Sequence, residues 1–341
     1  MKAILQTDAK RVEVRDIAKP TPGPQDVLVD VEHAGICGSD VHAYLLMDGF
    51  DWVKIPRVMG HEYAGSVVET GEDVTNVEVG DTVIEAPIHP CGNCPQCEVG
   101  DVNVCSNTTI SGMHTDGAYS EFVAVDEQHL LTCPDGLSSQ HAALTEPLSI
   151  AARAVYDRSS VTPGDTVLVQ GPGPIGILTA GLLDAMGAKV LLSGKQRDQK
   201  YRLPLADSLD ISTVNVNSDS LMEYMDGMTD GTGFDSVFDT TGHRSGIEGA
   251  VDLVRKGGEI IVVGLPGEPA ELFFSPIVRA ELDILAAYGS TPENFKQAMR
   301  GLDAGHIDAD RLIDTRYDVE TITDAFEDFL ESKTCKPVLA F

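Results

Sequence analysis

The spacing of hydrophobic positions changes near residue 150. Before that point the apolar positions form short runs, each about the length of a strand, as at 27–31, 64–68 and 81–84. Proline and glycine cluster at 20–24, ahead of the first of these runs. Short runs divided by turn residues predict a β-rich, barrel-like domain up to about residue 150.

A different pattern follows. The apolar run 166–170 leads into a glycine-rich turn at 171–176, then into a segment of helical period at 177–186 and a second apolar run at 189–193. This order of strand, turn, helix and strand predicts a βαβ unit.

The same pattern continues toward the C-terminus. Further strand-like runs occur at 236–239 and 259–264, with helical patterns between them. A doubly wound parallel sheet is therefore expected over about 155–285, so the predicted fold class is α/β. Residues 290–341 predict helices and a strand at 336–340.

Length and hydropathy indicate a folded protein of about two domains. The chain has 341 residues, of which 42% are hydrophobic. No apolar run approaches the ~20 residues of a membrane span, and no apolar leader follows Met1. These features predict a soluble, cytoplasmic protein.

Charge narrows the possible partners. Asp and Glu total 54 against 24 Lys and Arg, which gives a formal net charge of −30. Such a surface repels nucleic acid and anionic membranes, so neither is expected as a partner. The charge also exceeds what solubility alone requires. We hypothesise adaptation to high salt, where a Debye length of about 3 Å screens the repulsion between carboxylates.

Four cysteines lie close together with the spacing C-x2-C-x2-C-x7-C, at Cys91, Cys94, Cys97 and Cys105. Four thiolates in so short a segment predict a closed tetrahedral structural zinc site. The alternative is a pair of disulfides. It would strain the first three cysteines, which are too close in sequence, and nothing at the N-terminus indicates an oxidising compartment.

The glycine-rich turn carries the fingerprint Gly171-x-Gly173-x-x-Gly176. Placed between a strand and a helix, it predicts dinucleotide binding, with the pyrophosphate at the helix N-terminus. A glycine turn in an unrelated α/β fold is the alternative.

The end of the second strand bears on which dinucleotide binds. An acid that holds the ribose is expected there, but the strand ends at Gly194, followed by Lys195 and Arg197. Two cations in so acidic a chain favour NADP, although they could also belong to a solvated loop. The carboxylate of Asp198 is close to this position in the sequence, so NAD remains an alternative cofactor.

Potential ligands for a second metal are scattered between residues 37 and 146. Cys37 offers a thiolate, with Ser39 and His42 nearby. The remaining candidates are an imidazole and two carboxylates, from His61, Glu62 and Glu146. A catalytic zinc takes about three protein ligands and keeps one position open. Each residue alone is more often a core or surface residue.

Together these motifs resemble the zinc-dependent medium-chain alcohol dehydrogenases over the whole chain. The segments CGSDVH at 37–42, GHE at 60–62 and TEPLS at 145–149 occur in that family's order, with the cysteine segment and the glycine turn. CGSDVH with TEPLS looks most like the sorbitol and polyol dehydrogenase branch, with threonine and sugar dehydrogenases close by.

The resemblance implies the domain organisation. A GroES-like catalytic domain is expected at 1–153, with a structural-zinc lobe at 88–106. A Rossmann NAD(P)-binding domain is expected at 154–288, and a C-terminal segment at 289–341 completes the catalytic domain.

The resemblance also implies roles for single residues. Cys37, His61 and Glu62 match catalytic zinc ligands, and Glu146 matches a further ligand, bound directly or through water. Asp40 matches the carboxylate that orients the zinc-bound imidazole. Ser39 and His42 match a proton relay to solvent. The residues expected at the cofactor are Gly171, Gly173, Pro174, Ile175, Gly176, Gly194, Lys195, Arg197, Thr240, Thr241, Val263, Gly264 and Leu265.

The implied activity is hydride transfer between NAD(P) and a secondary alcohol, such as a polyol, sugar or related hydroxy compound, with two zinc ions per chain. A homodimer or homotetramer is expected. One alternative is a zinc-free quinone or enone reductase on the same fold, and another is a non-catalytic binding module built on the zinc lobe.

Three further residues have no role in these motifs. Arg153 stands where the polyol branch often has histidine, and Cys133 and Cys335 are expected to be buried free thiols.

Overall fold

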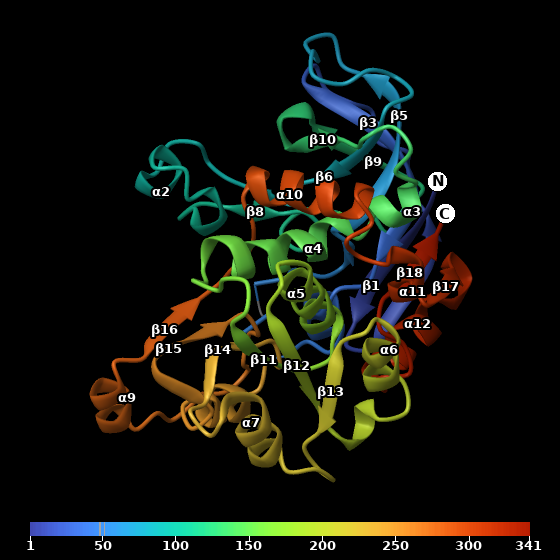
Figure 1. Ribbon diagram of the computed structural model, residues 1–341. Coiled ribbons are helices and arrows are strands. Elements are labelled where there is room, and N and C mark those ends of the chain that lie inside the picture. The colour runs from blue at the N-terminus through green and yellow to red at the C-terminus, as the bar shows by residue number, and fades with distance from the viewer. Residues whose placement is uncertain (48, 51) are drawn as a thin grey trace.

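The structure is a computed structural model that describes residues 1–47, 49–50 and 52–341. Figure 1 shows a β-rich part, built mainly from the blue N-terminal strands and the red C-terminal elements, beside an α/β part coloured green to orange. The predicted α/β fold class is therefore confirmed, and the two kinds of hydrophobic pattern correspond to these two parts.

Strands distant in sequence share the main sheet of the β-rich part, which has the order β10-β6-β5-β3-β18-β17, with β9 paired to β3. Its central strand β3 pairs antiparallel with β5 and with the C-terminal strand β18. A smaller sheet has the order β2-β1-β4. The strand bounds are Lys2–Asp8 (β1), Arg11–Asp16 (β2), Asp26–Gly35 (β3), Arg57–Val58 (β4), Glu62–Thr70 (β5), Thr82–Glu85 (β6), Phe122–Asp126 (β9), Leu130–Thr132 (β10), Thr315–Asp318 (β17) and Pro337–Ala340 (β18).

The α/β part is a parallel sheet with the order β13-β12-β11-β14-β15-β16. Every residue of β11 is buried, as expected for a strand covered by helices on both faces. The strands are Thr166–Gln170 (β11), Lys189–Gly194 (β12), Ser212–Asn215 (β13), Phe234–Asp239 (β14), Val254–Val262 (β15) and Asp283–Ala286 (β16). The helices are Pro174–Ala185 (α5), Arg202–Ser208 (α6), Leu221–Thr229 (α7), Arg244–Ala250 (α8) and Phe274–Ala280 (α9).

Helix α4 (Thr145–Ala152) joins the two parts and continues into a π-helical turn at Arg153–Asp157. It packs against α5 and against α10 (Pro292–Asp303), and one hydrophobic core runs through all three helices. The first turn of α4, which carries Glu146, is thereby placed between the two parts. The other helices are Gly38–Tyr44 (α1), Ser139–Ala142 (α3), Ala309–Leu312 (α11) and Ile322–Leu330 (α12).

The cysteine segment forms a lobe that projects beside the β-rich part, around α2 (Pro95–Glu98) (Figure 1). The paired strands β7 (Ile88–His89) and β8 (Thr109–Ile110) connect it to the rest of the molecule. The domain boundaries predicted from the sequence stay predictions. Among the described residues, no helix has both the length and the apolar character needed to cross a bilayer.

Candidate metal centre and cofactor cleft

A short helix presents three of the predicted site residues. Cys37 precedes α1, and its backbone N–H donates to the Asp40 carboxylate at 3.0 Å, which fixes the start of the helix. Ser39 and His42 lie three residues apart and both line the central cleft, whereas Asp40 is fully buried. The same turn of helix therefore presents Ser39 and His42 to the cleft and Asp40 to the protein interior.

His61 and Glu62 enter at the start of β5, directly after Gly60. Gly60 has φ +92°, and a Cβ there would approach the Tyr119 ring to 2.2 Å, so the position requires glycine. The ligand atoms of Cys37, His61 and Glu62 lie within 4.8 Å of one another. The structure thus brings together three residues that the sequence separates by up to 25 positions.

Asp40 holds His61 from the side away from the cleft. Its Oδ1 lies 3.4 Å from His61 Nδ1, and its Oδ2 accepts the Tyr119 hydroxyl at 2.8 Å. Burial would raise the pKa of Asp40, but the partners His61, Cys37 and Tyr119 outweigh it and hold the pKa below its usual range. An ionised Asp40 fixes the His61 ring, with Nε2 directed toward Ser39 Oγ at 3.4 Å.

Glu62 is paired with Lys336, a residue that the sequence analysis did not select. Both side chains are almost fully buried, and the ammonium group bonds Glu62 Oε2 and donates to the Ile36 carbonyl at 3.1 Å. Burial would lower the pKa of Lys336, but the anionic field of Glu62 and Cys37 outweighs it and raises the pKa. Lys336 therefore keeps its positive charge.

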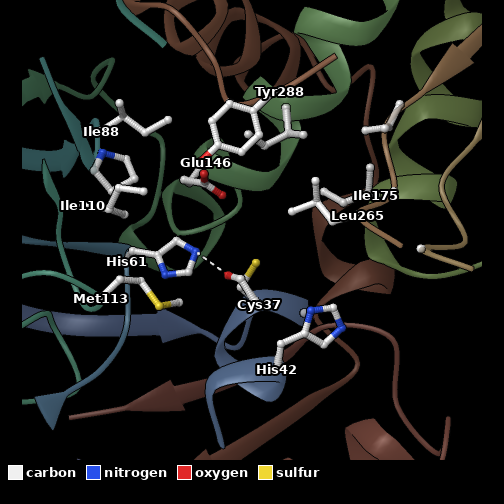
Figure 2. Close-up of a pocket in the computed structure, with 18 of the residues that line it drawn as sticks. Cys37, His42, His61, Ile88, Ile110, Met113, Glu146, Ile175, Leu265 and Tyr288 are labelled. Carbon is white, nitrogen blue, oxygen red and sulfur yellow. Dashed lines mark hydrogen bonds between the residues drawn. The ribbon is translucent and has the colours of Figure 1, made fainter. Parts of the chain in front are cut away.

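Glu146, from α4, faces the same cleft but lies outside the three-residue group whose ligand atoms are within 4.8 Å of one another. Burial, reinforced by repulsion from Glu62, raises its pKa to about 7, although His61 and Lys336 oppose this shift. Figure 2 shows Glu146 across the cleft from Cys37 and His61, with these side chains turned toward a common space.

The donor set suits a zinc ion. A thiol sulfur, an imidazole and a carboxylate within 4.8 Å match the ligand types of catalytic zinc sites, and Glu146 adds a second carboxyl. Burial and the nearby Glu62 raise the pKa of the Cys37 thiol, so a positive charge close to the sulfur would favour its thiolate form. A divalent cation bound by Cys37, His61 and Glu62 would supply that charge.

The cysteine lobe has the geometry of a second metal site. The Sγ–Sγ distances are 3.4 Å for Cys94–Cys97 and for Cys91–Cys105, and 3.7 Å for Cys94–Cys105. Four sulfurs about 2.3 Å from a tetrahedral zinc lie about 3.8 Å apart. Backbone N–H groups of Ser106 and Cys97 lower the pKa of Cys94 to about 6. The four thiols therefore fit the predicted structural zinc.

The glycine turn has the form that a dinucleotide needs. Gly171 has φ +98°, and a Cβ at Gly176 would come within 1.8 Å of the Gly171 carbonyl oxygen. Gly173 is open, with no atom within 4 Å of a Cβ placed there, and it begins α5 without a side-chain cap. Open space beside Gly173 at the N-terminus of α5 fits a pyrophosphate.

Two hollows meet at Thr240 and Thr241. The one toward the metal group is also lined by Ile175 and by Val263, Gly264 and Leu265, and has a volume of about 350 Å³. The other runs from Gly171 and Gly173 to the end of β12. Thr240 donates to the carbonyls of Gln170 and Gly171, which ties the end of β14 to the turn. Pro174 starts α5 beside this groove.

The far end of the groove carries the two predicted cations. Gly194, Lys195 and Arg197 line it. A Cβ at Gly194 would approach Pro172 and Leu203 to 2.8 Å, which explains why no acid occupies the end of β12. The neighbouring Asp198 uses Oδ2 to accept the Lys195 backbone N–H at 2.9 Å.

Two residues that hold the site were missed by the sequence analysis, Tyr119 and Lys336. Neither belongs to a recognised motif. The only available signal was a lysine at the edge of an apolar strand at 337–340. The buried state expected of Cys133 and Cys335 is confirmed.

Comparison with known proteins agrees with this arrangement. The model "Alcohol dehydrogenase GroES-like domain" matches residues 23–135, and "Zinc-binding dehydrogenase" matches 174–304. A sorbitol dehydrogenase of Halalkalibacterium halodurans is 32% identical over 344 residues, covering 99% of each chain.

Two solved structures share the whole fold. A putative zinc-binding dehydrogenase of Sinorhizobium meliloti bound to NADP has a TM-score of 0.90 at 30% identity, covering 100% of this chain and 99% of the other. An alcohol dehydrogenase of Escherichia coli CFT073 complexed with NADH has a TM-score of 0.91 at 31% identity, with the same coverage. The sequence, the two metal-ligand groups and these likenesses agree: the chain belongs to the zinc-dependent medium-chain alcohol dehydrogenases, with a GroES-like domain and a Rossmann domain.

Proposed function

We propose that this protein is a zinc-dependent oxidoreductase that transfers hydride between a secondary alcohol and NAD(P). One observation carries the proposal: Cys37 and His61 of the metal group line a cleft that meets the glycine-turn groove at Thr240 and Thr241. A metal-bound alcohol and a nicotinamide would therefore lie next to each other.

The side chains around the cleft would transfer the hydroxyl proton of the alcohol to solvent. Zinc, when bound, supplies a Lewis acid that lowers the pKa of an alcohol. Ser39 would take the hydroxyl proton, and His42 would pass it to solvent; both residues line the cleft. Burial lowers the pKa of His42, so the ring is neutral near pH 7 and has a free nitrogen to accept a proton. Asp40, held by Tyr119, keeps His61 in position.

Removing one ligand tests the catalytic zinc. We expect Cys37→Ser and His61→Ala to lower kcat/KM by at least a thousandfold while NADPH binding, followed by fluorescence titration, is retained. Cys133→Ser is the matched control, because that thiol is buried outside both clusters. Metal analysis of the parent should give about two zinc per chain. Activity of either ligand variant within tenfold of the parent would refute the assignment, and absence of zinc would favour the reductase alternative.

We also propose that the preferred cofactor is NADP. The absence of an acid at Gly194 and the position of Lys195 and Arg197 at the groove support this choice. The double variant Lys195→Ala/Arg197→Ala should lower kcat/KM for NADPH by at least a hundredfold and change that for NADH by less than threefold, since each lost phosphate contact to a charged group is worth about 1.5–3 kcal/mol. Lys189→Ala, at the other end of β12, is the control. A parent enzyme that prefers NADH would contradict the proposal.

We further propose a homodimer or homotetramer located in the cytoplasm. Strand β16 is the edge of the parallel sheet, and helix α9, which precedes it in the chain and packs on β15, exposes apolar residues, including Phe274 and Val278. An edge strand beside an apolar surface favours association with a second copy. Light scattering after size-exclusion chromatography measures the oligomeric state, and a monomer at micromolar concentration would contradict this part of the proposal.

A further inference from the structure

The wall of the cleft opposite the cofactor is apolar. Figure 2 shows Ile88, Ile110 and Met113 on one side of the metal group, and Ile175 and Leu265 on the other. Ile88 and Ile110 come from β7 and β8, the paired strands that carry the cysteine lobe. The nicotinamide is expected on the side of Ile175 and Leu265, which leaves the first three residues to face the substrate.

A row of rings extends this apolar wall toward the opening of the cleft. His42 meets Phe50 edge-on, with 5.2 Å between ring centroids, and Phe50 stacks on Trp52 at 6.0 Å. Trp52 in turn stacks on His114 at 4.4 Å. Trp52 remains 39% exposed although it lines the cleft, so part of its ring is available to a ligand.

Charged side chains are scarce in the same wall. Among the described residues that line the cleft there is no lysine, arginine or aspartate, and the one glutamate is Glu146, the candidate further ligand. A sugar phosphate would find no cation to pair with its phosphate, and the carboxylate of threonine would also lack a partner. Each additional polyol hydroxyl buried against Ile88, Ile110 or Met113 would lose a hydrogen bond to water, which costs about 1–3 kcal/mol.

From this lining we propose that the substrate is a secondary alcohol with an apolar alkyl or aryl substituent, or the corresponding ketone. The proposal rests on the function proposed above and narrows the class of secondary alcohols given there. The carbinol carbon gives its hydride to the nicotinamide, and the hydroxyl proton leaves through Ser39 and His42 to solvent. The alcohol is oxidised to a ketone while NADP⁺ is reduced to NADPH. The substituent lies between Met113 and the rings of Phe50 and Trp52.

A substrate panel tests the proposal. Initial rates with 1-phenylethanol, 2-octanol, 2-propanol, sorbitol, L-threonine and a hexitol phosphate would be measured with NADP⁺ and with NAD⁺ at high KCl concentration. We expect kcat/KM for 1-phenylethanol or 2-octanol to exceed that for each of the three polar compounds by at least a hundredfold. A value for any polar compound within tenfold of the best apolar alcohol overturns the inference but leaves the proposed function intact. No oxidation of any alcohol by the zinc-loaded enzyme overturns the proposed function itself.

A variant locates the effect in the cleft. Trp52→Ala should lower kcat/KM for 1-phenylethanol at least tenfold, because one face of the substituent loses its contact, and change that for 2-propanol by less than threefold. Tyr224→Ala is the control, since this exposed aromatic residue lies on α7, away from the cleft. An equal loss for both alcohols would show that Trp52 supports the fold or the metal rather than the substituent, and would contradict the assignment of this wall.

Discussion

The ammonium group of Lys336 forms a buried ion pair with the carboxylate of Glu62, across 274 positions of sequence. Lys336 precedes β18, and Glu62 begins β5. Both strands pair with β3, so the sheet itself brings the two residues together. The metal-ligand candidate Glu62 thus has its ion-pair partner, Lys336, in a distant segment of the chain. The metal site therefore depends on the pairing of β18 with β3.

Lys336→Met should lower the free energy of unfolding by about 3–5 kcal/mol, because it leaves the Glu62 carboxylate buried without its partner. Urea unfolding at pH 7 measures the change. Lys333→Met is the control, because Lys333 forms only exposed ion pairs and should change stability by less than about 1 kcal/mol. The double variant Glu62→Gln/Lys336→Met should recover part of the loss. Equal stability of the two lysine variants would disprove the structural role of the pair.

Tyr119→Phe should weaken zinc binding about 10- to 100-fold, the usual effect of removing a group that supports a metal-ligating histidine. The lost hydroxyl donates to Asp40 at 2.8 Å, and Asp40 orients His61. Competition with a chromogenic chelator gives the affinity. Tyr44→Phe, which removes a hydroxyl donating to the Lys10 carbonyl at 3.1 Å, should leave it unchanged. If both variants bind zinc as tightly as the parent, the Tyr119 hydroxyl does not support the metal site and the side chain contributes only to packing.

Cys94→Ser should reduce the zinc content from about two ions per chain to about one. The remaining thiols cannot close a tetrahedral site, and the lobe around α2 should become sensitive to protease. Elemental analysis and limited proteolysis are the measurements, with Cys133→Ser as the control. Retention of both ions would show that the cluster is not a zinc site.

Acid should destabilise the protein in part through His129. Burial, together with the stacked ring of His89 at 3.7 Å, lowers the pKa of His129 to about 4. The folded state thus binds fewer protons than the unfolded state, whose pKa is about 6.5, so stability is complete above pH 6.5 and is lost as pH falls toward 4. Allowing for partial exposure, the loss between pH 7.5 and 5 should be about 1–2 kcal/mol.

His129→Phe keeps a ring against His89 and should remove this part of the pH dependence, as urea unfolding at the two pH values would show. His306→Phe, at an exposed position, should leave the dependence as it is. The same pH slope in the parent and in His129→Phe would contradict the prediction.

Salt should stabilise the chain strongly if the charge of −30 reflects a high-salt environment. We expect the melting temperature to rise by at least 10 °C between about 0.1 M and 2 M KCl, because a shorter Debye length weakens repulsion between carboxylates. Differential scanning fluorimetry at a series of KCl concentrations measures this. Full stability and activity in dilute buffer would refute the hypothesis.

Local patterns explain what the sequence could predict. The βαβ unit could be predicted because its parts are contiguous in the sequence: the run 166–170, the turn Gly171–Gly176 and the following helix. The four cysteines span only fifteen positions. By contrast, the contacts of Tyr119 with Asp40 and of Lys336 with Glu62 arise from strand pairing between distant segments. A buried lysine and a surface lysine look the same in a sequence, and only the closed sheet distinguishes them.

The pairing of β18 with β3 also sets an order of events during synthesis. Lys336 follows the whole cofactor-binding domain in the chain, so a ribosome must produce that domain before the lysine exists. Until then Glu62 has no ammonium partner, and the nascent metal group carries one more uncompensated negative charge than the finished protein. The metal group therefore reaches its final set of charges only after β18 has paired with β3, so we expect metal loading to follow completion of the chain.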